Sequence, residues 1–310
     1  MALMNDIYVR DTENLNWNVG GFMSHDRYLI ELLDKCKEMQ ISLPFKYVFG
    51  SIPCKWQGGR IAPRDATLGV VARLIHEYNS RGVGVRFTFS SYLINEADLS
   101  DEVCNAIMQL LSNDPRNGVI ISSDILYDYI KQKYPQVQMI ASIVKSAHEC
   151  PTADAAYYNR LINKYDLVVI DSSFIDEPKF LSKLSDCSKI EFLANHRCMK
   201  NCPMAAKHYD TQTKLEQAVL ADNKADIEKY SEQLKKINEY CIHAKTEDPT
   251  NISTLSQSDI YHLIGLGCTN FKLEGRDYDG LTFVRDLGTW IFDPYGPYLG
   301  IAHVILGNPV

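Results

Sequence analysis

The sequence of 310 residues has few features of a membrane protein or of a protein that coats nucleic acid. Its formal net charge of -7 argues against binding bare duplex nucleic acid through a broad basic face, although a local basic pocket stays compatible with it. No apolar run approaches the roughly 18 residues that span a bilayer, and the first residues lack the basic and apolar regions of a secretory signal. We therefore expect a soluble, cytoplasmic protein with no membrane partner and no broad nucleic-acid surface.

The sequence also lacks an internal repeat, a low-complexity tract and a Gly/Ser-rich linker. Apolar residues make up 45% of the chain and charged residues 23%, which is average for a globular protein and gives no sign of disorder or of a coiled coil. A chain of this length can form one α/β barrel. We predict a single barrel domain over residues 1–310.

Short β-branched runs alternate with stretches of helical length, a pattern typical of βα units around a parallel sheet. Seven runs have the character of strands, at residues 46–50, 84–89, 118–122, 138–142, 166–171, 189–194 and 269–273. Helices are expected between them, among others at residues 65–79, 124–133, 153–163 and 178–184. The fold class that we predict is α/β, a TIM-like (β/α) barrel of seven or eight parallel strands.

Two further stretches concern the closure of this barrel. A helix at residues 28–39 precedes the first predicted strand, and we expect it to take the place of the final barrel helix. Residues 300–306 are the candidate for an eighth strand. One connection, residues 195–268 after the sixth predicted strand, is far longer than the others and contains the charged helical stretch 213–240. Long connections in compact folds are usually functional, so we predict a cysteine-bearing helical insertion there.

Nine cysteines in a chain without a secretion signal argue against a disulfide framework, because the cytosol keeps thiols reduced. Cys198 and Cys202 directly follow a predicted strand, and in a helix their spacing would place them on one face. Cys241 ends the charged helical stretch, which can fold back toward them. Three converging thiolates suit iron or zinc, so we predict a metal site at these residues. The alternative is that they are unrelated buried cysteines.

A fourth metal ligand is less well defined. Cys187 and Cys268 precede strands, so strand polarity places them at the end of the barrel opposite to the site. Cys54 follows the first predicted strand and is the best remaining thiol. The alternatives are an open position for substrate or water, and His196, His208 and His243.

Polar residues follow most of the predicted strands, at the barrel end where active sites lie. The candidates for catalysis are Arg60, Asn195, His196, Glu274 and Arg276. Arg60 and Arg276 could anchor an anionic substrate by bidentate contacts, and Glu274 could orient the substrate or move a proton. A carboxylate beside an arginine usually stays ionised, so a role for Glu274 in positioning Arg276 fits equally well. Serines in these positions, such as Ser122, Ser123 and Ser142, are candidate helix N-caps.

Several motifs between residues 166 and 277 together resemble those of the collagenase-like peptidase family (U32), of which the chain would be a divergent member. Cys198 and Cys202 follow a Glu-Phe-Leu strand, Cys241 comes next, and then Ser-Gln-Ser-Asp-Ile (256–260), Gly267 and Phe-Lys-Leu-Glu-Gly-Arg (271–276). The family's usual His-Gly-Ala-Leu-Cys segment reads Ala-Asn-His-Arg-Cys here (194–198), and no cysteine stands at the family's fourth position.

The resemblance implies a barrel with a cysteine-bound 4Fe-4S cluster, ligated by Cys198, Cys202 and Cys241, and a strand-end pair at Glu274 and Arg276. Several members of the family look like oxygen-independent hydroxylases of RNA bases or of quinone precursors that work with partner proteins. The first function that we predict is therefore an iron-sulfur enzyme, for oxygen-independent hydroxylation or a related redox modification of a small anionic or nucleotide-like substrate. Its cofactor would be a 4Fe-4S cluster, with zinc as the alternative.

Two other functions remain open. One is a peptidase or other hydrolase that uses zinc or a cysteine nucleophile, for which Cys198 could pair with His196 or His208. The sequence contains no His-Glu-x-x-His helix and no Gly-x-Ser-x-Gly elbow. The other is a cluster-stabilised protein that binds a protein partner, with the aromatic stretch 290–298 either exposed as the binding surface or packed against its own barrel.

Overall fold

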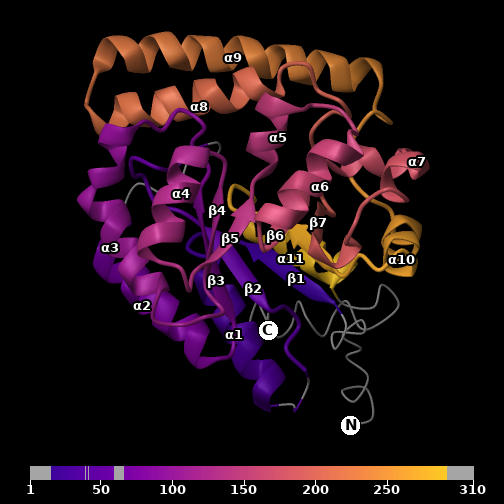
Figure 1. Ribbon diagram of the computed structural model, residues 1–310, viewed down its shortest axis with the longest axis horizontal. Coiled ribbons are helices and arrows are strands. Elements are labelled where there is room, and N and C mark those ends of the chain that lie inside the picture. Colours follow the sequence, from indigo (N-terminus) through magenta and orange to yellow (C-terminus); the bar gives the residue numbers. More distant parts are fainter. Residues whose placement is uncertain (1–14, 39, 41, 59–65, 292–310) are drawn as a thin grey trace, which may run out of the picture.

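Eight short strands form the centre of the computed structural model, which describes residues 15–38, 40, 42–58 and 66–291 (Figure 1). All eight run parallel and pair in sequence order, and β1 also pairs with β8, so the sheet closes on itself. The strands are β1 (Asn16–Gly20), β2 (Tyr47–Gly50), β3 (Gly84–Phe89), β4 (Gly118–Ile121), β5 (Gln138–Ala141), β6 (Leu167–Ile170), β7 (Ile190–Leu193) and β8 (Asn270–Leu273). The predicted TIM-like (β/α) barrel is confirmed.

Helices connect the strands and surround the barrel. The α-helices are α1 (Asp26–Glu38), α2 (Leu68–Ser80), α3 (Glu102–Leu111), α4 (Asp124–Lys133), α5 (Ile143–Glu149), α6 (Ala155–Lys164), α7 (Pro178–Leu181), α8 (Ala205–Leu220), α9 (Lys224–Glu247), α10 (Gln257–Gly265) and α11 (Gly280–Trp290). Short 3-10 helices are η1 (Glu96–Ser100), η2 (Ser172–Asp176) and η3 (Cys187–Lys189). Ser123 and Ser142 cap α4 and α5 by accepting hydrogen bonds from backbone N–H groups, as predicted for these serines.

The first strand of the barrel is one that the sequence did not predict. Val19 of β1 lies opposite Val48 of β2 on one side and opposite Leu273 of β8 on the other. Helix α1 therefore belongs to the first βα unit, and the prediction that it precedes the first strand and closes the barrel is wrong. Residues 300–306, the predicted eighth strand, lie outside the described residues. Asparagine and glycine are depleted in strands, which hides the run Asn-Trp-Asn-Val-Gly among loop sequences.

The interior of the barrel has an apolar part and a charged part. Its apolar cluster consists of Phe49, Ile120, Ile140, Leu167, Val169 and Leu193. The charged part contains Arg86 of β3 and Glu191 of β7, whose Nη1 and Oε1 atoms lie 2.8 Å apart. Since β3 and β7 lie on opposite sides of the closed sheet, this ion pair crosses the barrel.

Further contacts surround Glu191, whose side chain is fully buried. The Nδ2 atom of Asn18 donates to Glu191 Oε1 at 3.3 Å, and Lys272 Nζ lies 4.0 Å from Oε2. The guanidinium of Arg86 stacks 3.6 Å from the ring centroid of Tyr47. Because a buried charge is costly unless it is paired and hydrogen-bonded, these contacts explain how a carboxylate is held inside the barrel.

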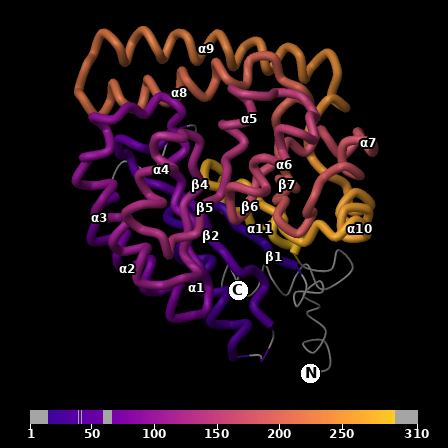
Figure 2. Tube along the Cα trace, viewed as in Figure 1, coloured from indigo at the N-terminus to yellow at the C-terminus, as the bar shows by residue number. Residues whose placement is uncertain are grey.

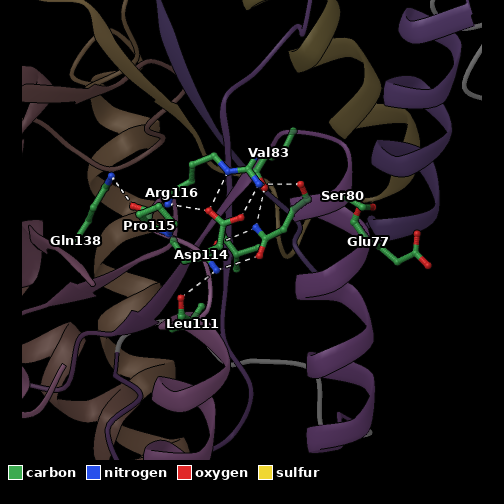
Figure 3. A network of polar contacts seen from close by, with 11 residues as sticks. Glu77, Ser80, Val83, Leu111, Asp114, Pro115, Arg116 and Gln138 are labelled. Carbon is green, nitrogen blue, oxygen red and sulfur yellow. Dashed lines mark hydrogen bonds and ion pairs between the residues drawn. The ribbon is translucent and has the colours of Figure 1, made fainter. Parts of the chain in front are cut away.

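A polar network lies at the end of the barrel where the strands begin (Figure 3). Asn117, just before β4, accepts hydrogen bonds from Val85 N at 2.8 Å and from Asn79 Nδ2 at 2.9 Å, and donates to the carbonyl of Leu111 at 3.1 Å. Arg116 adds a hydrogen bond to the carbonyl of Asn79 at 2.9 Å. The network ties α2 and α3 to β3 at the end of the barrel that normally serves stability.

The long connection after β7 contains α8, α9 and α10, and corresponds to the predicted insertion at residues 195–268. It follows the seventh strand rather than the sixth because β1 was missed. Helices α8 and α9 run side by side along one edge of the molecule, next to α5 (Figures 1 and 2). His148 of α5 contacts Asp210 of α8, with Nε2 and Oδ1 2.8 Å apart.

Within the described part of the chain, no helix combines the length and the apolar character needed to cross a membrane. That residues 1–310 form one domain stays a prediction.

Candidate active site

The segment after β7 carries several of the candidate residues, and it is held by a second segment just before α10. The N–H of Leu255 donates to the carbonyl of Ala194 and the N–H of Ser253 to the carbonyl of Cys198, both at 2.9 Å. Between them, the hydroxyl of Thr254 donates to the carbonyl of His196 at 2.9 Å. Residues 194–204 are therefore not helical, and α8 begins only at residue 205. The condition under which the spacing would place Cys198 and Cys202 on one helix face is therefore not met.

Asn195 fixes this segment to the end of β8. Its Oδ1 accepts from the N–H of Glu274 at 2.8 Å, while its Nδ2 donates to the carbonyl of Glu274 at 2.9 Å and to Oδ2 of Asp286 in α11 at 2.8 Å. Arg197 reaches the same Asp286 oxygen at 3.3 Å. Asn195, predicted as a catalytic residue, has its carboxamide fully engaged with protein atoms. Its geometry is that of a residue that positions Glu274.

His196 and Cys198 lie in the same turn segment as Asn195 and Arg197, directly after β7. The imidazole of His196 is buried, with 3% of its surface exposed, and hydrogen-bonds the thiol of Cys198. Burial lowers the pKa of His196, but the negative charges of Glu274, Cys198 and Asp171 outweigh burial and raise it from 6.5 to about 9. At neutral pH the ring is therefore an imidazolium beside the partly exposed sulfur of Cys198, the state in which the imidazole holds the proton that it shares with the thiol.

The raised pKa of His196 predicts how stability depends on pH. Between pH 6.5 and about 9 the folded protein keeps a proton that the unfolded chain releases. The stabilisation is therefore complete below pH 6.5 and is lost as pH rises through about 9. Urea unfolding at pH 6.5 and 9.5 should show this loss in the native protein and a smaller loss in His196→Gln.

The matched control is His243→Gln, because His243 lies on the exposed face of α9, beside Glu247. This variant should keep the pH dependence of the native protein. If the free energy of unfolding falls by the same amount between pH 6.5 and 9.5 in His196→Gln and in the native protein, His196 is not the group that titrates.

The other predicted catalytic residues are only partly brought together. Glu274 lies close enough to His196 and to Lys272 to raise the pKa of both. Arg276 is partly buried, and its Nη1 donates to Ser51 Oγ after β2 at 3.4 Å. Arg60 lies outside the described residues. The structure thus places His196, Cys198 and Glu274 together, with Arg276 also at the barrel end where the strands finish.

The three predicted metal-binding thiols lie in one region of the structure. Burial raises the pKa of Cys202, and the thiols of Cys198 and Cys241 raise it further, so the insertion does bring Cys241 toward the other two. No group of three or more His, Cys, Asp and Glu side chains that could hold a metal ion exists within the described ranges. That these thiols bind a cluster or zinc therefore stays a prediction.

Cys54, the best candidate for a fourth ligand, lies in a different environment. It is buried and hydrogen-bonds the thiol of Cys104 in α3. Cys187 and Cys268, which strand polarity separated from the site, hydrogen-bond each other just before β7 and β8. Four of the nine cysteines therefore form two thiol pairs away from Cys198.

The charged residues inside the barrel were missed by the sequence reasoning. Arg86, Glu191 and Lys272 each stand in the middle of a strand whose residues are all buried. A charged side chain at such a position is shielded from water on both faces of the sheet. It must therefore be paired with another charge inside the barrel or take part in the functional site. That signal was available, because the strands themselves were predicted.

Comparisons with known proteins agree with this fold and add little beyond it. No protein-family profile matches the sequence, and no curated protein matches it either. The chain is similar in structure to a U32 peptidase, Mk0906, with a TM-score of 0.52 at 12% sequence identity. The similarity covers 86% of this chain and 94% of that one. At this identity the comparison shows a distant U32-like fold.

These findings correct the predicted function. The prediction of an iron-sulfur redox enzyme is wrong, because the structural neighbour is described as a peptidase and the described residues offer no set of three metal ligands. The identity of any cofactor, whether a 4Fe-4S cluster or zinc, stays a prediction for metal analysis.

Proposed function

We propose that the protein is a thiol hydrolase that cleaves amide bonds of small substrates or peptides, with Cys198 as the nucleophile and His196 as its base. The observation that carries this proposal is the hydrogen bond between the buried His196 imidazole and the Cys198 thiol, with the Glu274 carboxylate in the same electrostatic environment. A nucleophile, a base and a carboxylate that supports the base are the parts that covalent acyl transfer needs.

The proposed reaction has two stages. The Sγ atom of Cys198 attacks the carbonyl carbon of the substrate, and His196 holds the thiol proton and passes it to the leaving amine. Water then attacks the thioester, with His196 taking its proton, and the free thiol returns to Cys198. Glu274 stabilises the imidazolium by its charge, while Asn195 holds the Glu274 backbone through two hydrogen bonds.

Two further observations support a hydrolase. The fold is similar to that of a protein described as a U32 peptidase, although at 12% identity this likeness carries the fold alone. The site lies after β7 and β8, at the barrel end where TIM-barrel active sites form. A zinc hydrolase is less well supported, because zinc in catalytic sites usually has three protein ligands and no such group occurs in the described part of the chain.

The test is hydrolysis of a peptide mixture by the purified full-length protein, before and after stoichiometric alkylation with iodoacetamide. We expect Cys198 to be alkylated ahead of the buried Cys36, Cys104 and Cys268, and cleavage to stop in proportion to its modification. The chelator phenanthroline should leave cleavage unchanged.

Metal analysis of the same anaerobically purified sample completes the test. Cleavage that persists when Cys198 is fully alkylated would overturn the proposal. So would cleavage that requires stoichiometric iron or zinc, which would return the thiols to the role of metal ligands.

A further inference from the structure

Lys272 occupies an unusual place in the barrel, because it is a lysine in the middle of the fully buried strand β8. Only 8% of its side chain is exposed. The ammonium lies 4.0 Å from the ring centroid of Phe49, a member of the apolar cluster inside the barrel. The neighbouring strand β7 places Leu193 of the same cluster opposite Lys272. The amine therefore lies at the border between this apolar cluster and the charged residues inside the barrel.

The amine is also weakly partnered. Its nearest carboxylate oxygen is Glu191 Oε2 at 4.0 Å, and Glu191 is already engaged by Arg86 at 2.8 Å and by Asn18. Within the described residues, no atom accepts a hydrogen bond from Lys272 Nζ at normal length. A structural lysine in a buried ion pair would be expected to make such bonds, because an unmet buried donor is costly.

The surroundings shift the protonation equilibrium of the amine toward its neutral form. Burial lowers the pKa of Lys272 from 10.5 to about 8, and the positive charges of Arg276 and Arg86 lower it while Glu191 and Glu274 oppose them. Desolvation together with nearby cations is the arrangement that turns a lysine into a nucleophile near neutral pH.

We propose that Lys272 is an amine nucleophile that forms an imine with a small carbonyl compound carrying a carboxylate, entering from the end of the barrel where the strands finish. Arg276, which is partly exposed at that end, supplies a positive charge for the carboxylate. The two proposals use different nucleophiles and share Glu274, and imine formation at Lys272 does not depend on hydrolysis.

The reaction balances without an oxidant or a reductant. The lone pair of Nζ attacks the carbonyl carbon, and proton transfer from nitrogen to oxygen gives a carbinolamine. Its hydroxyl takes up a proton and leaves as water, so a C=N bond replaces the C=O bond. Glu274, partly exposed and close enough to act on the charge of Lys272, relays that proton from solvent. Addition of water reverses each step.

The experiment uses the full chain with glyoxylate as the carbonyl probe and sodium cyanoborohydride to trap the imine at pH 7. Peptide mapping by mass spectrometry locates and times each carboxymethyl adduct. We expect Lys272 to be modified at least about tenfold faster than the exposed lysines Lys235 and Lys236, because a larger fraction of its amine is neutral. Acetate in excess should slow the modification of Lys272 by competing for the same cationic site.

Two variants separate this proposal from the hydrolase. Lys272→Arg keeps the charge and should remove the fast adduct, while Lys236→Arg should leave it unchanged. Cys198→Ala should also leave it unchanged, so a failed hydrolase proposal does not affect this result. Modification of Lys272 no faster than that of Lys235 in the native protein would overturn the proposal, whether or not Lys272→Arg folds.

Discussion

Replacing Cys198 with alanine should reduce kcat/KM for peptide hydrolysis by a factor of about 10³ or more. The reason is that the variant loses the nucleophile, and the remaining His196 has no thiol to deprotonate. His196→Ala should cause a loss of similar size, and the double variant should lose little more, because the two residues act as one unit. Initial rates over a range of peptide concentrations, with thermal unfolding of each variant alongside, measure the effect.

The thiols of Cys202 and Cys241 provide the matched controls for this prediction. Both lie in the same region as Cys198, and neither contacts His196 among the interactions that set the pKa of that ring. Cys241→Ala should therefore keep activity within about threefold of the native protein, since thiols outside the reacting unit act only through weak electrostatics. If Cys241→Ala lowers kcat/KM as much as Cys198→Ala does, the thiols share a metal. This result would contradict the role of Cys198 as the nucleophile.

Most of the barrel could be predicted from the sequence because its strands are buried on both faces and read as continuous apolar runs. Strand β6, Leu-Val-Val-Ile, is such a run. Strand β1 escaped prediction because Asn16 and Asn18 break the apolar pattern, and their partners are far away in the sequence. Asn16 donates to Asn270 at 2.9 Å and Asn18 to Glu191 at 3.3 Å, both across more than half the chain. No local pattern contains that information.

The candidate site was predicted in part for the same reason. The position of His196 and Cys198 directly after a strand places them at the correct end of the barrel. The spacing of Cys198 and Cys202, however, was interpreted as helical, and the segment is instead pinned by Ser253, Thr254 and Leu255. Pairing with a segment more than fifty residues away holds the backbone in the conformation in which His196 contacts Cys198. A short motif cannot reveal such a partner.

Replacing Arg86 with methionine should lower the free energy of unfolding by about 3–5 kcal/mol, because the change leaves a buried carboxylate without its closest charge partner. Glu191 is fully buried, and after the substitution it retains only Asn18 at 3.3 Å and Lys272 at 4.0 Å. Urea unfolding at pH 7, followed by circular dichroism, measures the loss. Arg73→Met is the control, since Arg73 is mostly exposed and lies 3.8 Å from Asp26, a pair expected to contribute less than about 1 kcal/mol.

A second substitution distinguishes loss of charge pairing from loss of packing. Arg86→Met combined with Glu191→Leu removes both charges, and the double variant should recover most of the stability that Arg86→Met loses, because no unpaired charge remains in the barrel. In this double variant, loss of Glu191 lowers the pKa of Lys272 and loss of Arg86 raises it, so the two effects oppose each other. A double variant less stable than Arg86→Met would contradict this explanation. The packing of the barrel interior, including the stacking of Arg86 on Tyr47, would then contribute more to stability than the ion pair between β3 and β7.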